Sequence, residues 1–285
     1  MAGTGSERHS AKGATVTATR TAIHKTVLLR HGKTRYIDVG RGHPLILLHV
    51  SSIESGADDC LATLDVLSPM FRVLAPDLLG FPPSDTFDGI DAFPFLVDFL
   101  REFQDALGIK SSHIVGASMG GWIAGLFAYE SPERCDKVVI GGHPFTGAPN
   151  RGMLNFSVDS VTPDAKVREW VANRTLGYGV DTEALVQEKL AKIHEPGFAE
   201  AFTTLMLSMG NPTNRSRYAM ISRLPHLRVP ALILLGERDQ AAMQLKDEVM
   251  AAAATAELKI IPSGHRMHIE DPELFANTVR EYLVK

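Results

Sequence analysis

The chain has 285 residues, a formal net charge of −4 and 45% hydrophobic residues. This length and composition suit one globular unit whose hydrophobic core is large enough to be stable without disulfides. The weak negative charge excludes the basic surface that nucleic acid or an anionic membrane would require, and neither partner is predicted. No run approaches 18 apolar residues, which excludes a transmembrane helix from the prediction.

The first 22 residues are small, polar and mildly basic, and they lack the apolar stretch of a secretory signal. We expect a disordered tail at 1–22. Cys60 and Cys135 are isolated from one another and form no CxxC motif, so we predict buried, reduced thiols. These features favour a cytoplasmic protein. The sequence leaves a homodimer open.

Short apolar runs alternate with segments of helical spacing along the first half of the chain. The expected strands are 26–29, 34–39, 44–49, 71–75, 112–115 and 137–140, and the expected helices are 58–67, 93–107 and 120–129. Strands that alternate with helices pair in parallel and carry helices on both faces of the sheet. Ligands of such sheets bind at the carboxyl ends of the strands.

The pattern changes after Gly142. Residues 145–224 contain no convincing strand, and helices are expected at 164–175, 182–194 and 199–209. Alternation then resumes, with strands at 231–235 and 257–261 and helices near 241–254 and at 273–283. The prediction is an α/β fold with a mostly parallel central sheet flanked by helices. Its core comprises 23–144 and 225–285, and a helical cap is inserted at 145–224.

A tight turn joins the strand at 112–115 to the following helix. Its sequence, GASMG at 116–120, is a G-x-S-x-G pattern in the strand–turn–helix context that a nucleophilic serine requires. The two glycines are needed because side chains there would collide with neighbouring backbone. The strained turn pushes the Ser118 hydroxyl above the sheet, and the helix N-terminus behind it favours developing negative charge. We therefore predict Ser118 as the nucleophile.

A serine hydroxyl needs a base, and the base needs an orienting group. Among eleven histidines, His265 stands at the carboxyl end of the last strand, in a Ser-Gly turn before the final helix. His268 is the rival, three residues further on, where a capping or surface role suits it better. Asp239 follows the strand at 231–235 and is preferred over Glu237, which is closer to the strand and within the turn. We predict His265 as the base and Asp239 as its orienting acid.

These motifs resemble the α/β-hydrolase superfamily. GASMGG, LLGERD and GHRMHIEDP are similar to its nucleophile, acid and histidine motifs, in the family's chain order, and the resemblance covers about residues 23–285. The loop APDLLGFPPSD also resembles a family turn, in which Asp77 would be structural. The resemblance implies a serine hydrolase without a cofactor.

The same resemblance implies an oxyanion hole, with one N–H from Met119 after the nucleophile. The second N–H would come from the loop after the strand at 44–49. That loop usually reads His-Gly-x, but here Val50 follows the histidine. Valine resists a backbone conformation that glycine permits. Ser51 N–H is the predicted second donor, with Ser52 as the alternative.

The segment 145–224 resembles the cap of meta-cleavage-product hydrolases, which cleave carbon–carbon bonds. Those enzymes usually carry Trp after the catalytic histidine, where this chain has Arg266, and their carboxylate-binding cap arginine has no clear counterpart near Lys189. An esterase acting on a small hydrophobic or aromatic substrate is therefore predicted, with the C–C hydrolase as the alternative. The predicted substrate contacts are Val50, Ser52, Arg266 and Phe145. Arg168 and Arg174 are further candidates for binding an acidic group.

The same residues also bear on other functions of this fold. A serine at 118 disfavours epoxide hydrolases and haloalkane dehalogenases, whereas cofactor-free haloperoxidase chemistry uses the same triad and stays open. A ligand-binding protein that kept the fold but lost turnover is the non-enzyme alternative, favoured only by Val50. The sequence contains neither a phosphate-binding loop motif nor a convincing metal-ligand spacing, so no metal or cofactor is predicted.

Overall fold

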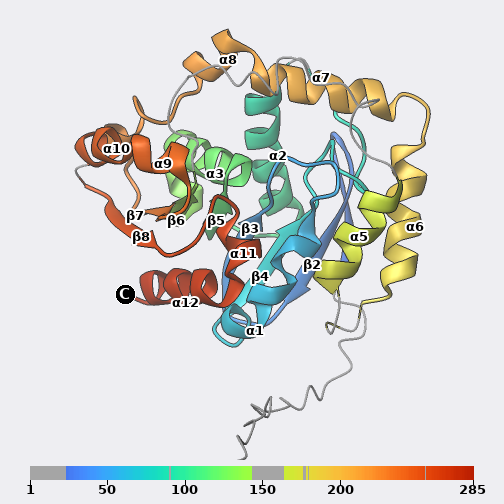
Figure 1. The fold of residues 1–285 in the computed structure, drawn as a ribbon, viewed down its shortest axis with the longest axis horizontal. Helices are drawn as coiled ribbons and strands as arrows, with labels where there is room; N and C mark the ends of the chain where they lie inside the picture. Colours follow the sequence, from blue (N-terminus) through green and yellow to red (C-terminus); the bar gives the residue numbers. More distant parts are fainter. Residues whose placement is uncertain (1–23, 90, 143–163, 176–177, 179, 254) are drawn as a thin grey trace, which may run out of the picture.

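An eight-stranded sheet forms the centre of the molecule (Figure 1). The computed structural model describes residues 24–89, 91–142, 164–175, 178, 180–253 and 255–285. The strand order is β1-β2-β4-β3-β5-β6-β7-β8. The first hairpin and the β2–β4 pair are antiparallel, and every other pair is parallel. The predicted fold class is confirmed. The predicted tail and Phe145 lie outside the described residues.

The observed strands follow the apolar runs closely. They are β1 (His24–Leu29), β2 (Gly32–Val39), β3 (His43–Leu48), β4 (Phe71–Pro76), β5 (Ser112–Ala117), β6 (Cys135–Gly141), β7 (Ala231–Gly236) and β8 (Glu257–Ile261). Most extend the predicted run by one or two residues. Backbone pairing continues past the apolar run, into polar residues at the start of β1 and into buried glycine and alanine at the end of β5.

The helices also follow the expected periodicity. They are η1 (Ala57–Thr63), α1 (Leu64–Leu67), α2 (Ala92–Ala106), α3 (Met119–Glu130), η2 (Pro132–Arg134), α5 (Asp164–Thr175), α6 (Thr182–Ile193), α7 (Phe198–Gly210), α8 (Pro212–Arg217), η4 (Leu224–His226), α9 (Gln240–Gln244), α10 (Lys246–Ala252), α11 (Met267–Glu270) and α12 (Pro272–Leu283). Among the described residues, no helix combines the length and hydrophobicity that a bilayer crossing requires.

Two predicted helices differ from the structure. The segment expected as one helix over 58–67 is a 3₁₀ helix, η1, followed by the single turn α1. Asp58 and Asp59 are both buried in η1, and Asp58 is paired with Arg35. Buried ionic partners outweigh the local preference for an α-helix there. The helix expected near 241–254 is divided at Leu245 into α9 and α10.

Side chains alternate between two cores on opposite faces of the sheet. On β3, Ile46 and Leu48 belong to the core shared with α2 and α3, whereas Leu45 and Leu47 belong to the core shared with α1 and α12. This is the period of two that a strand imposes. The helices therefore cover both faces, as the alternating sequence predicts (Figure 1).

A buried arginine joins the hairpin to the loops that follow β3 and β4. The guanidinium of Arg35 donates from Nε to Asp77 Oδ2 at 2.6 Å and pairs through Nη2 with Asp58. The other Asp77 oxygen accepts the backbone N–H of Ala57 at 2.8 Å, at the start of η1. Burial alone would raise the pKa of Asp58, but the Arg35 charge holds that pKa well below its usual range. The network therefore contains ionised groups that depend on each other.

Four of the helices, α5 to α8, stand between β6 and β7 in the chain, within the segment predicted as a cap. Two lysines of α6 reach the body of the protein. Lys192 Nζ lies 3.0 Å from Asp85 Oδ1. The Lys189 ammonium is buried and donates to Glu54 O at 3.2 Å, Ser55 O at 3.1 Å and Pro82 O at 2.9 Å. The three acceptor carbonyls lie in the loops that follow β3 and β4. Lys189 thereby connects α6 to both loops.

Candidate functional site

A strained residue marks the junction of β5 and α3. Ser118 has φ 55° and ψ −121° and is the one non-glycine residue with positive φ in the described part of the chain. A Cβ added at Gly116 would lie 2.3 Å from the backbone carbonyl carbon of Gly120, and one added at Gly120 would lie 2.4 Å from Leu48 O. Both positions require glycine because backbone occupies the space of a side chain. The turn therefore holds the serine in a conformation that few residues adopt.

The structure brings Ser118, His265 and Asp239 together. His265 Nε2 lies 2.9 Å from Ser118 Oγ, and His265 Nδ1 lies 2.7 Å from Asp239 Oδ2. A carboxylate only accepts, so the proton between His265 and Asp239 belongs to Nδ1, which leaves Nε2 to accept from the serine hydroxyl. Asp239 is buried, and its Oδ1 accepts the backbone N–H of Ala242 at the start of α9. Both of its oxygens are thus held in place.

The two rivals take no part in these hydrogen bonds. Glu237 is exposed at the surface. His268 is buried in α11, and neither of its ring nitrogens finds a hydrogen-bond partner among the described residues. Burial, together with the nearby His49 and the Arg174 and Arg266 charges, lowers the pKa of His268 to about 3. His268 is therefore a neutral core residue rather than the surface or capping histidine that the sequence suggested.

The buried His268 should make the protein less stable in mild acid. Its pKa is near 6.5 in the unfolded chain and about 3 in the folded protein, so the unfolded state binds the extra proton between these values. Its contribution to stability is complete above pH 6.5 and is lost as pH falls toward 3. We expect His268→Leu to flatten the fall in unfolding free energy between pH 6.5 and 5 by about 1 kcal/mol per pH unit. Urea denaturation at each pH measures this, and equal slopes in both proteins would contradict it.

A second buried histidine shapes the loop after β3. His49 Nε2 accepts the backbone N–H of Leu78 at 3.1 Å, and its Nδ1 donates to Val50 O at 2.8 Å. Burial lowers the pKa of His49, which keeps the ring neutral and suited to one donated and one accepted bond. Val50 is buried and does not have positive φ. Valine is therefore compatible with this loop, because His49 sets its path without a glycine.

The predicted oxyanion donors lie on segments that approach each other closely. Met119 is the first residue of α3, and the backbone of Gly120 next to it packs against the end of β3, from which the loop of Val50 and Ser51 continues. Ser51 is half-buried in a bend directly after Val50. The Ser52 hydroxyl is bonded to the Ser55 hydroxyl at 2.9 Å. The roles of Met119 and Ser51 stay a prediction, and Ser52 holds its own loop together.

A tryptophan that the sequence reasoning passed over stands between two of the candidate cations. The Trp170 ring in α5 lies 3.4 Å from the Arg174 guanidinium carbon and 5.2 Å from that of Arg266. Trp170 Nε1 and Arg174 Nε both donate to Asp59 Oδ1, at 3.2 and 3.1 Å. Trp170 and Arg174 are four residues apart on a helix, which is the spacing that could have revealed their shared face.

The arginines therefore have different surroundings. Arg168 is exposed and forms a surface ion pair with Glu183. Arg174 is engaged with Asp59. Arg266 is exposed and follows His265 directly in the chain. Of the three, Arg266 is the one that forms no ion pair among the described residues and is next to the His265 of the triad in sequence, and its role as a substrate contact stays a prediction.

Comparisons with known proteins identify the family of the chain. A profile described as the alpha/beta hydrolase family matches residues 45–278. A 2-hydroxymuconate semialdehyde hydrolase from Pseudomonas putida is 29% identical over 92% of this chain and 95% of that protein. One from Pseudomonas sp. strain CF600 is 30% identical over 92% and 94%. A solved meta-cleavage product hydrolase from Pseudomonas fluorescens IP01 is similar with a TM-score of 0.70 and 28% identity, covering 92% of this chain and 97% of that one. The chain belongs to the alpha/beta hydrolase family and is a hydrolase.

Proposed function

We propose that the protein is a serine hydrolase in which Ser118, His265 and Asp239 act as a catalytic triad. The observation that carries the proposal is the continuous pair of hydrogen bonds from Ser118 Oγ through His265 to Asp239, at 2.9 and 2.7 Å. The strained Ser118 backbone supports it, because such strain is kept where a reactive group must be presented.

The proposed reaction has two stages. His265 Nε2 takes the Ser118 proton as Oγ attacks a carbonyl carbon, and Asp239 stabilises the imidazolium that forms. The N–H groups of Met119 and Ser51 bind the oxyanion. His265 then gives its proton to the leaving fragment, and an acyl-serine remains. Water, deprotonated by the same nitrogen, then attacks the acyl carbon. As the bond from the acyl carbon to Ser118 Oγ breaks, His265 Nε2 returns the proton to Oγ, which releases the acid and the free serine.

For the bond that is broken, we propose a carbon–carbon bond next to an aldehyde or ketone carbonyl in a small acidic substrate. The support is the similarity to two 2-hydroxymuconate semialdehyde hydrolases over more than nine-tenths of each chain. The exposed Arg266 beside the base supplies a positive charge for the carboxylate of such a substrate. These relatives favour the carbon–carbon bond over the ester bond that the sequence alone predicts.

Ester hydrolysis is the second candidate, and one observation favours it. The family's carboxylate-binding cap arginine has no clear counterpart near Lys189, and the Lys189 ammonium is itself occupied by three backbone carbonyls. An ammonium with its three donors already satisfied has none left for a substrate carboxylate. A neutral ester needs no such partner.

Parallel assays should separate the two candidates. We expect 2-hydroxymuconate semialdehyde and 2-hydroxy-6-oxohepta-2,4-dienoate to be hydrolysed with kcat/KM at least about 100-fold above p-nitrophenyl acetate and butyrate. Loss of the dienoate absorbance and release of p-nitrophenolate report the two reactions in the same buffer. Turnover of the esters alone would overturn the carbon–carbon proposal and leave the serine mechanism in place.

A further inference from the structure

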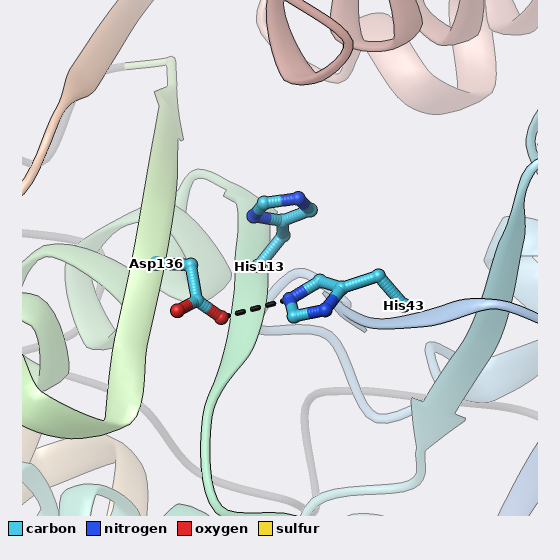
Figure 2. A group of neighbouring side chains, drawn as sticks. All are labelled: His43, His113 and Asp136. Atoms are coloured by element: carbon cyan, nitrogen blue, oxygen red, sulfur yellow. Dashed lines mark hydrogen bonds and ion pairs between the residues drawn. The ribbon is translucent and has the colours of Figure 1, made fainter.

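Three potential metal ligands meet at the amino ends of three adjacent strands, far from Ser118. His43 begins β3, His113 is the second residue of β5, and Asp136 is the second residue of β6 (Figure 2). One ring nitrogen of each histidine and one carboxylate oxygen lie within 4.8 Å of one another. His43 Nε2 is 2.8 Å from Asp136 Oδ2, and the two histidine rings are 4.6 Å apart at their centres.

An irregularity in the β5–β6 pairing lies at this group. Ser112 is opposite Cys135 and Ile114 is opposite Val138, so two residues of β6 are opposite His113 alone. Cys135 and Val138 both pack into the core on the α2 and α3 face, although regular alternation would place residues three apart on opposite faces. The extra residue is a β-bulge. Alternation from Cys135 places Asp136 on the opposite face of the sheet, which is also the face of His113, because Ile114 next to it packs in the α2 and α3 core.

The buried member of the group has an unused nitrogen. His113 is only 8% exposed, and its Nδ1 has no hydrogen-bond partner among the described residues. A buried polar atom without a partner costs free energy, so it calls for an explanation. Figure 2 shows the His113 ring next to the His43–Asp136 pair. A cation between the three side chains would satisfy this nitrogen.

We propose that His43, His113 and Asp136 bind one divalent transition-metal ion, with Zn²⁺ as the best-matched ion. Two imidazole nitrogens and one carboxylate oxygen, with water as the fourth ligand, form a common tetrahedral zinc set. Ligand atoms of such a site are about 3.3 Å apart, given metal–ligand bonds of about 2.0 Å. The ligand atoms now lie within 4.8 Å of one another and would have to move closer. The side chains of His43 and Asp136 are 44% and 37% exposed, which leaves them room to rotate toward the ion.

The site is separate from the hydrolase chemistry. His43 and His49 stand six residues apart on β3 and its following loop, which corresponds to about 20 Å along a strand. A metal there would join β3, β5 and β6 at the ends opposite the Ser118 turn. Its effect should be on the stability of the sheet rather than on turnover. The spacings of 70 and 23 residues between the ligands explain why the sequence shows no metal motif.

Zinc titration of the untagged, chelator-treated full chain tests the proposal. We expect one Zn²⁺ per chain by calorimetry and by elemental analysis after desalting, and a rise in Tm when Zn²⁺ is added. His43→Asn and Asp136→Asn change partly exposed side chains and should each weaken binding at least about tenfold. His113→Gln should do the same, and retained labelling of Ser118 by a fluorophosphonate would show that each variant is folded.

His194→Asn is the matched control. It removes a histidine–aspartate pair, with Nε2 3.1 Å from Asp164 Oδ1, that has no place in the three-residue group. Zinc affinity should be unchanged in this variant. The proposal is overturned when the wild type binds no Zn²⁺, or when His43→Asn and Asp136→Asn bind it as tightly as the wild type does.

Discussion

Ser118→Ala should lose fluorophosphonate labelling completely and lower kcat by about 10⁵- to 10⁶-fold on the best substrate. The expected loss is this large because the substitution removes the Oγ that lies 2.9 Å from His265 Nε2, and with it the proposed nucleophile. Gel fluorescence after probe treatment measures the labelling, and steady-state assays measure kcat. A wild-type protein that is not labelled would instead favour the ligand-binding alternative.

A pair of histidine variants gives the control for this experiment. His265→Gln should reduce labelling and kcat to a similar level, because the base is lost. His268→Leu should keep both near the wild-type level, since His268 is buried and bonds none of the three residues. Activity in His265→Gln together with inactivity in a folded His268→Leu would reverse the assignment of the base.

Arg35→Met should lower the free energy of unfolding by about 3–5 kcal/mol. The substitution removes the guanidinium that pairs with Asp58 and Asp77, and both carboxylates remain buried. Two buried carboxylates that lose this guanidinium are costly even with the Lys189 charge nearby, whereas the methionine side chain fills much of the arginine stem's volume. Urea denaturation of the two proteins at pH 7 gives the difference.

The surface pair of Arg168 and Glu183 provides the comparison. Arg168→Met also removes one arginine from an ion pair, but both partners are largely exposed, so stability should change little. If the two variants lose the same stability, burial is not what makes the Arg35 network important. A further drop in catalytic rate in Arg35→Met would show that the loop after β3 depends on this network.

The sequence predicted the elements whose signal is local. Apolar runs located the strands, and the two glycines around Ser118 identified the turn because backbone contact leaves no room for another residue. His265 and Asp239 followed from their positions after strands. The fold class could be predicted for the same reason: strands that alternate with helices have few other arrangements.

The features that the sequence did not reveal depend on contacts across long separations. The bonds of Lys189 to the loops after β3 and β4, and the group of His43, His113 and Asp136, join residues that no periodic pattern relates. The 3₁₀ form of η1 is set by the buried pairing of Asp58 with Arg35 rather than by helix propensity. Local propensity cannot describe a segment whose conformation is decided by a distant partner.

The three hydrogen bonds of Lys189 to the loops after β3 and β4 form between segments that are synthesised at different times. Glu54 is synthesised 135 residues before Lys189, whose ammonium donates a hydrogen bond to the Glu54 carbonyl. At a synthesis rate of roughly 5–20 residues per second, this corresponds to about 7–27 s without that donor. The nascent loop after β3 must therefore remain solvated or bind elsewhere until α6 has emerged. The segment that carries Val50 and Ser51 is consequently completed late, although it is encoded early.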